Sequence, residues 1–225
     1  MGNRKLKKRI LELLGSDDFE KRLEDICRMP ARQAVNPLFS FFYNTDPRIR
    51  WRSIVAMGAV VSRLADEDME SARVVMRRLI WNLNDESGGI GWGSPEAMGE
   101  IMARHGGLAE EYARILVSYA DENGNYLEHE TLQRGVLWGM GRLAHARPNL
   151  LEQAAPFLLS FLQSEDVVHR GLAAWTLAAI PSVSAKSLLQ KLVDDNTSID
   201  IFLDMHLKEF TVGRLAGKAL SALEK

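Results

Sequence analysis

The stretch that decides the fold is Ile49-Arg50-Trp51-Arg52-Ser53-Ile54-Val55-Ala56-Met57-Gly58. An aliphatic residue at a position we call zero is followed by Arg at +1, small residues at +4 and +7, a large apolar residue at +8 and Gly at +9. Apolar residues spaced in this way lie on one face of an α-helix. The small residues allow a second helix to approach closely. The stretch therefore predicts a helix that packs tightly against a neighbour.

The same spacing recurs along the chain, although the second, third and fifth units lack the Arg at +1. The zero positions are Ile49, Ile90, Leu132, His169 and Val212, which gives spacings of 41, 42, 37 and 43 residues. A period near 40 residues is typical of two-helix solenoid repeats. In each repeat we expect the motif to form the second helix. The first helices are expected at residues 33–43, 69–83, 108–120, 150–162 and 185–193.

The motif resembles the HEAT-repeat family, which places an Asp before an aliphatic-Arg pair and an Ala-rich helix that ends in Leu-Gly. Asp46 and Asp166 stand three residues ahead of their zero positions, and Arg50 and Arg170 follow at +1. The resemblance covers roughly residues 31–225. It implies an all-α fold, an α-α superhelix (α-solenoid) of about five HEAT-like helical hairpins in a single domain, residues 1–225. It also implies that the second helices line a concave surface suited to binding.

The two ends of the chain depart from the repeat. Residues 3–14 and 17–28 predict two charged capping helices within 1–30, the second begun by Ser16 as its N-cap. In the last repeat the apolar residues alternate with other residues, which is the period of a strand. They are Ile199, Ile201, Leu203, Met205 and Leu207. We expect a short β-hairpin there.

Composition and charge exclude several classes of protein. The net charge is −2, and the chain has a single cysteine, Cys27, so an intramolecular disulfide framework is excluded. Residues 1–52 carry 12 Lys/Arg against 7 Asp/Glu, but residues 53–132 carry 6 against 14. An acidic middle argues against gripping a phosphate backbone, so nucleic acid is not expected as a partner. No apolar run approaches the roughly 18 residues of a membrane span, and we expect a cytoplasmic protein.

Four of the five tryptophans occupy equivalent positions, +2 or +6 of the second helices. They are Trp51, Trp92, Trp138 and Trp175, with Arg134 at +2 of the third repeat. Positions +2 and +6 are one turn apart and share a face. Two interpretations stay open: an aromatic stripe in the binding groove, or rings that pack between neighbouring repeats. Trp and Arg are the residue types found most often as binding anchors.

A second candidate is the acidic rim formed by the turns of the second and third repeats. Equivalent turns of a solenoid stack along one edge, which would gather carboxylates, one amide and one imidazole. The residues are Asn84, Asp85, Glu86, Glu128, His129 and Glu130. Such a rim could be simply solvated, could accept a basic peptide or could hold a divalent metal. We expect no metal.

No catalytic motif is present in the sequence, because a nucleophile elbow, a Cys-His signature and an H-E-x-x-H helix are all lacking. We therefore expect a non-catalytic scaffold without a cofactor, which binds a protein or peptide through its concave face and the rim of the second and third repeats. The alternatives are an accessory enzyme or lyase subunit of the HEAT-like class, and a helical-repeat DNA glycosylase.

Overall fold

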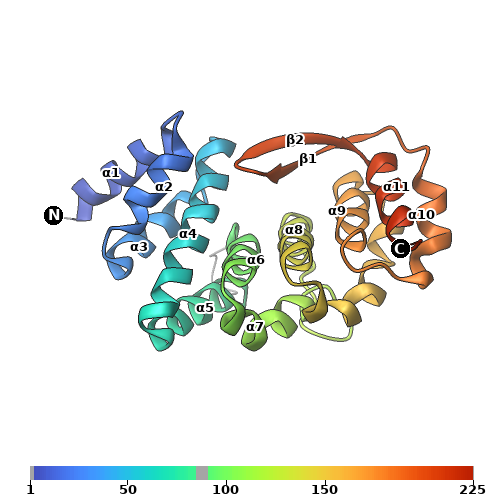
Figure 1. The fold of residues 1–225 in the computed structure, drawn as a ribbon, viewed down its shortest axis with the longest axis horizontal. Coiled ribbons are helices and arrows are strands. Elements are labelled where there is room, and N and C mark those ends of the chain that lie inside the picture. Colours follow the sequence, from blue (N-terminus) through green and yellow to red (C-terminus); the bar gives the residue numbers. More distant parts are fainter. Residues whose placement is uncertain (1–2, 85–90, 225) are drawn as a thin grey trace. The chain divides into compact units, whose positions relative to one another are not determined.

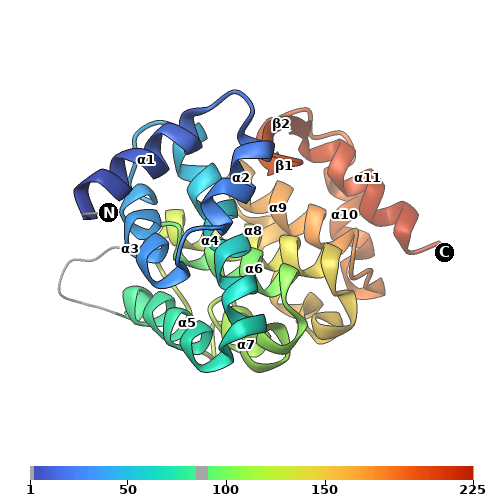
Figure 2. The same cartoon turned by 60° about the vertical axis from the view of Figure 1, so that its left-hand side comes forward.

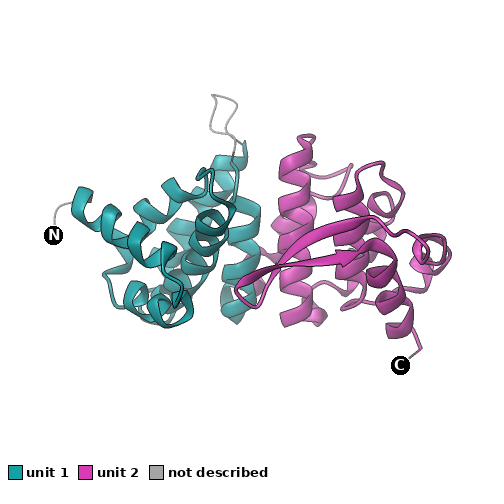
Figure 3. Ribbon diagram, turned by 90° about the horizontal axis from the view of Figure 1, so that it is seen from above, with its two compact units in different colours: residues 1–108 teal, residues 109–225 magenta. Residues whose placement is uncertain are grey.

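The computed structural model describes residues 3–84 and 91–224. The contacts divide the chain into two compact units, residues 1–108 and residues 109–225 (Figures 1 and 3). Each unit is described by itself. The predicted single domain over residues 1–225 stays a prediction.

Unit 1 holds two capping helices followed by two helical hairpins. The capping helices are α1 (Asn3–Gly15) and α2 (Phe19–Cys27). The hairpins are α3 (Ala31–Phe41) with α4 (Pro47–Glu67), and α5 (Met69–Asn84) with α6 (Ser94–Arg104). The two second helices, α4 and α6, pack against each other, and α2 covers α4. These elements match the predicted helices, although α2 begins after Asp18, whose side chain makes no capping hydrogen bond, so the predicted Ser16 cap is wrong.

Unit 2 holds the remaining three hairpins, and the boundary between the units falls in the first turn of α7. The first of these hairpins is α7 (Gly106–Ser118) with α8 (Glu130–Ala146). The second joins the 3-10 helices η1 (Pro148–Leu150), η2 (Glu152–Leu158) and η3 (Phe161–Gln163) to α9 (Val167–Leu177). The third is η4 (Val183–Ala185) and α10 (Lys186–Leu192), then β1 (Ser198–Leu203), β2 (His206–Thr211) and α11 (Val212–Ala222). Figures 1 and 2 show α11 beside α10.

The second helices approach each other at small residues, as the sequence predicts. A Cβ added at Gly58, position +9 of the first repeat, would overlap the Glu100 side chain of α6. A Cβ at Gly141, position +9 of the third repeat, would overlap the Trp175 ring of α9. Only glycine leaves room for these contacts. At both positions the second helix of the following repeat therefore packs directly against the glycine at +9.

Short polar residues begin three of the second helices by accepting hydrogen bonds from otherwise unpaired backbone N–H groups. Asp46 accepts from the Arg48 N–H at 2.8 Å, and Asp166 accepts from the Val168 N–H at 2.8 Å. Thr211 does the same for α11. The Asp that the repeat motif places before its zero position is thus a helix cap.

The first helix of the fourth repeat is not the α-helix predicted for residues 150–162. The chain instead forms three short 3-10 helices there. Pro156 lies inside η2, and proline has no N–H to donate and clashes with the preceding turn of an α-helix. Pro148 is the first residue of η1. Proline suits a first helical turn because the N–H that it lacks would have no partner there.

The second helix of the second repeat begins later than its motif predicts. Its zero position is Ile90, but α6 starts only at Ser94. Gly93 has φ = +78°, a left-handed conformation that side chains with a Cβ rarely adopt, and a Cβ there would stand 2.8 Å from Phe42. Pro95 then occupies the first turn, as expected.

The predicted β-hairpin is confirmed. β1 and β2 pair antiparallel from Ser198 opposite Thr211 to Leu203 opposite His206, and Ile201 is fully buried. The two-residue turn is Asp204-Met205, with φ of 49° and 66°. Positive φ at both turn residues is the requirement of a type I′ turn, which favours Asp-Gly or Asn-Gly.

Met205→Gly should stabilise unit 2, because it places Asp-Gly in this turn and removes the Cβ from a left-handed conformation. We expect the free energy of unfolding in urea to rise by about 1 kcal/mol. Asp200→Gly, an exposed position within β1, is the control and should lower it, because glycine weakens a strand interior. An unchanged or lower stability for Met205→Gly would contradict this description of the turn.

Candidate functional site

Helix α5 of unit 1 presents two different faces. Its inward face is apolar and buried, and comprises Ala72, Val75, Met76, Leu79 and Leu83. The outward face has side chains at i, i+3, i+4 and i+7, namely Val74, Arg77, Arg78 and Trp81. Trp81 is 75% exposed, whereas Trp92, the other exposed tryptophan among the described residues, is 38% exposed. The outward face thus exposes two large apolar side chains, Val74 and Trp81, with two arginines between them.

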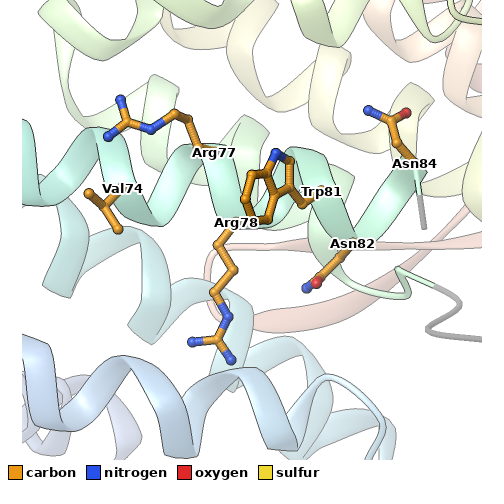
Figure 4. Close-up of a pocket in the computed structure, with 6 residues that line it drawn as sticks. All are labelled: Val74, Arg77, Arg78, Trp81, Asn82 and Asn84. Atoms are coloured by element: carbon orange, nitrogen blue, oxygen red, sulfur yellow. The ribbon is translucent and has the colours of Figure 1, made fainter. Parts of the chain in front are cut away.

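A pocket of about 670 Å³ lies on this outward face (Figure 4). We call it the α5 pocket and define it by its six lining residues, Val74, Arg77, Arg78, Trp81, Asn82 and Asn84. Asn84 is one of the residues that the sequence analysis selected. The other five were not selected. The volume is of the size that binding pockets for small ligands or single side chains usually have.

Neighbouring helices and α5 itself hold both arginines of the α5 pocket in place. The Arg78 guanidinium donates to Asn36 Oδ1 of α3 at 2.5 Å and lies over the Phe39 ring, 4.1 Å from its centroid. Arg77 Nη2 donates to Glu70 Oε1 at 2.6 Å, one pair of turns earlier on α5. A cation held over an aromatic face is restrained in position. The charged groups of the pocket are therefore positioned before any partner arrives.

A second exposed aromatic group lies where the first and second repeats meet in unit 1. The Tyr43 and Trp92 rings are 6.3 Å apart at a tilt of 33°, and Trp92 is 38% exposed. Gly91 lies directly against the end of α5, since a Cβ there would stand 2.6 Å from the Asn82 carbonyl oxygen. The glycines of the Gly91-Trp92-Gly93 segment thus let the chain fold back closely on its neighbours.

Two polar side chains at the start of α6 are buried without a partner. Ser94 Oγ and Glu96 Oε2 are both shut off from solvent and have no hydrogen-bond partner within residues 3–84 and 91–224. Glu96 as a residue is half-buried, but its carboxylate is enclosed. Burial raises the pKa of Glu96 from 4.5 to about 7, although its own N–H and the charge of Arg50 act in the opposite direction.

The raised pKa of Glu96 predicts a pH dependence of stability. The folded state holds this proton more tightly than the unfolded state, so the free energy of unfolding falls as pH rises from about 4.5 to about 7. Glu96→Gln removes the ionisation, and at pH 8 it should be more stable than the wild type by at most about 3 kcal/mol. At pH 4 the difference should vanish. Urea unfolding of both proteins at the two pH values is the measurement, and a difference independent of pH would contradict the burial of this carboxylate.

In unit 2 the tryptophans of the second helices pack between elements. Trp138 is 3% exposed, and its Nε1–H donates to the Phe202 carbonyl of β1 at 3.3 Å. Trp175 is 6% exposed, lies against Gly141 and stacks on His145 with ring centroids 5.0 Å apart. For these two residues the packing interpretation holds and the groove interpretation does not. In unit 1 Trp51 is half-buried and Trp92 is exposed.

Arg134 connects neighbouring repeats of unit 2. Its Nε donates to Asp166 Oδ2 at 2.7 Å, and its Nη2 lies 2.5 Å from Glu130 Oε1. These bonds raise the pKa of Arg134 and tie α8 to the cap of α9. Arg170 makes the corresponding pair with Asp195 at 2.9 Å in the next repeat. Arg134 therefore has a structural role that the sequence analysis did not foresee.

The predicted acidic rim is described only in part. His129 Nδ1 accepts from the Thr131 N–H at 3.2 Å and so acts as the N-cap of α8, while Glu128 and Glu130 are exposed. Asp85 and Glu86 lie outside the described residues. Asn84 belongs to unit 1 and residues 128–130 to unit 2, so the rim stays a prediction. Within residues 3–84 and 91–224, no group of three or more His, Cys, Asp or Glu side chains is arranged to hold a metal ion.

Two further expectations from the sequence can be compared with the structure. Cys27 is half-buried, and burial, followed by the charge of Glu24, raises the pKa of its thiol. A protonated thiol is a poor nucleophile. Across the described residues, no helix combines the length and the apolar character needed to cross a bilayer.

The chain is similar to known repeat proteins in part of its sequence and in its fold. The family model described as the HEAT-like repeat matches residues 130–180. A designed armadillo repeat protein in complex with the peptide (KR)4 matches 95% of this chain and 98% of its own, with a TM-score of 0.54 at 16% identity. Residues 130–180 thus match a HEAT-like repeat, and the fold of the chain is similar to that of a designed armadillo repeat protein.

Two other proteins are also similar to this chain. The match to the designed armadillo repeat protein YIII(Dq)4CqI covers 96% of this chain and 98% of that protein, with a TM-score of 0.54 at 15% identity. At such identities the likeness concerns the fold alone. An uncharacterized protein of Archaeoglobus fulgidus is 30% identical over 120 residues, which are 52% of this chain and 59% of that protein. The chain thus spans less than two thirds of that relative.

A signal for the α5 pocket was present in the sequence. Val74 and Trp81 are seven residues apart and out of phase with the buried positions of the same helix, which marks a second face. The equivalent repeat positions that hold the other four tryptophans lie in second helices, whereas Val74 and Trp81 lie on a first helix. Arg78 gave no such signal, since its partners Asn36 and Phe39 are about forty residues away in the sequence.

Proposed function

We propose that this HEAT-like repeat protein is a non-catalytic interaction module that binds a protein or peptide through the α5 pocket of unit 1, and that it works in the cytoplasm. The observation that carries the proposal is Trp81, a large aromatic side chain left 75% exposed beside two positioned arginines. Trp and Arg are the residue types that dominate binding energy at protein interfaces.

The fold supports the same proposal. Stacked helical hairpins offer extended surfaces and have no need of chemistry to be useful. One structural neighbour, a designed armadillo repeat protein, is in complex with the peptide (KR)4. That neighbour shows what such repeats can do, and the side chains of this chain decide where a partner would bind.

The burial of Arg52 argues against the DNA glycosylase alternative. Arg52, a basic residue of the N-terminal part of the chain, is 7% exposed and donates through Nη1 to the carbonyl oxygens of Leu14 and Ser16. Its guanidinium also lies over the Phe19 ring. Arg52 therefore ties α4 to the capping helices rather than facing a groove.

Trp81→Ala tests the proposal. Peptides selected from a random display library on the immobilised protein should lose roughly 30-fold in affinity for this variant, because a central aromatic anchor contributes about 2 kcal/mol. Titration by fluorescence anisotropy measures the loss. Because Trp81 is exposed, the substitution should leave the thermal midpoint nearly unchanged.

Trp92→Ala is the matched control, since it removes an exposed tryptophan of the same unit outside the α5 pocket. We expect it to change the affinity of the selected peptides by less than about 3-fold. If Trp92→Ala abolishes binding while Trp81→Ala retains it, the site lies at the Tyr43–Trp92 pair instead.

A further inference from the structure

The chemical character of the α5 pocket indicates which partner it would accept. Its lining has two guanidinium groups, two carboxamides, one indole and one valine, and no carboxylate among its described members. Guanidinium and indole groups donate hydrogen bonds and do not accept them. The described lining is therefore rich in hydrogen-bond donors and carries two cationic groups, within a part of the chain where residues 53–132 carry 6 Lys/Arg against 14 Asp/Glu.

One arginine of the α5 pocket, Arg77, already pairs with a carboxylate of this chain. Glu70, on the same helix, places Oε1 2.6 Å from Arg77 Nη2, and its other oxygen lies 3.5 Å from Arg73 Nη1. This carboxylate is exposed and approaches Arg77 from the N-terminal end of the pocket. A carboxylate from a partner could replace it or bind beside it, because a guanidinium carries five donors.

An apolar contact accompanies the charges. Val74 and Trp81 are both exposed and lie seven residues apart on the outward face, with the arginines between them. An aromatic ring and a valine one pair of turns apart match the spacing of apolar side chains along a bound helix or extended segment. The partner must therefore offer apolar and acidic residues together.

We propose that the α5 pocket binds an acidic peptide segment, in which one or two large apolar side chains contact Trp81 and Val74 while flanking Asp or Glu side chains pair with Arg77 and Arg78. This inference rests on the proposed function and names the partner class of the same site. Charge complementarity selects this occupant over a basic peptide, which the two arginines would repel.

The test uses three fluorescein-labelled synthetic peptides that share the same Phe and Leu residues and differ only in having Glu, Gln or Lys between them. Anisotropy titration should rank them Glu, Gln, Lys, with the Glu peptide at least about 10-fold tighter than the Gln peptide at low salt. That advantage should shrink as ionic strength rises from about 0.01 M to about 0.5 M, because the charges are solvent-exposed.

Variants of the pocket sharpen the test. Arg77→Gln and Arg78→Gln should each weaken the Glu peptide by about 3-fold, and Arg63→Gln, an exposed arginine of α4, is the matched control. Glu70→Gln removes the competing carboxylate and should strengthen the Glu peptide by about 2- to 5-fold. Glu20→Gln removes an equal charge from α2 and should have less effect. A gain of affinity cannot arise from misfolding.

The outcomes separate the two proposals. If the Lys or Gln peptide binds more tightly, and Trp81→Ala still abolishes its binding, the partner class is wrong and the site stands. If none of the three peptides nor any displayed peptide binds, both fail. If the protein sediments as a dimer that Trp81→Ala dissociates, or if a single-stranded DNA oligomer displaces the Glu peptide at equal concentration, the occupant is a second copy or a nucleic acid and the inference is overturned.

Discussion

The close approach of consecutive second helices at a small residue governs the rest of this structure. At Gly58 the helix of the next repeat places the Glu100 side chain where a Cβ would be, and at Gly141 the Trp175 ring does the same. Helices that meet in this way bury their large side chains between repeats. The Asp caps at Asp46 and Asp166 fix where α4 and α9 begin.

This packing decides which residues remain for binding. In unit 2 the indoles of Trp138 and Trp175 fill space between elements and are closed to a partner. In unit 1 the exposed aromatic side chains lie elsewhere, with Trp81 on the outward face of a first helix. The repeated register thus corresponds to packing for Trp138 and Trp175, but Trp92 at an equivalent position is 38% exposed. Trp81 is out of phase with the buried positions of α5 and lies on the surface. The same reasoning separates Arg52 and Arg134, which join elements, from Arg77 and Arg78, which line the α5 pocket.

Much of the fold could be predicted from the sequence because the spacing of apolar and small residues along the chain indicates the repeat. The second helices, the small residues at +9 and the hairpin at residues 198–211 follow from periods of 3.6, about 40 and 2 residues. The 3-10 segment at residues 148–163 was missed because helical periodicity does not register that Pro156 cannot donate an N–H. The α5 pocket was missed for a different reason. Its geometry depends on Arg78 meeting Asn36 and Phe39 across two helices, and no local pattern encodes that contact.

The most direct test of the account follows the indole N–H groups of the five tryptophans by nuclear magnetic resonance in ¹⁵N-labelled protein during titration with the acidic peptide. If the peptide binds at the α5 pocket, the Trp81 signal, assigned from the Trp81→Phe variant, shifts progressively until the peptide saturates the protein. The signals of Trp138 and Trp175 should stay in place because both side chains are buried in packing contacts. If the signals of Trp138 and Trp175 shift while the Trp81 signal does not, binding at the α5 pocket is contradicted. The binding surface would then lie on the second helices.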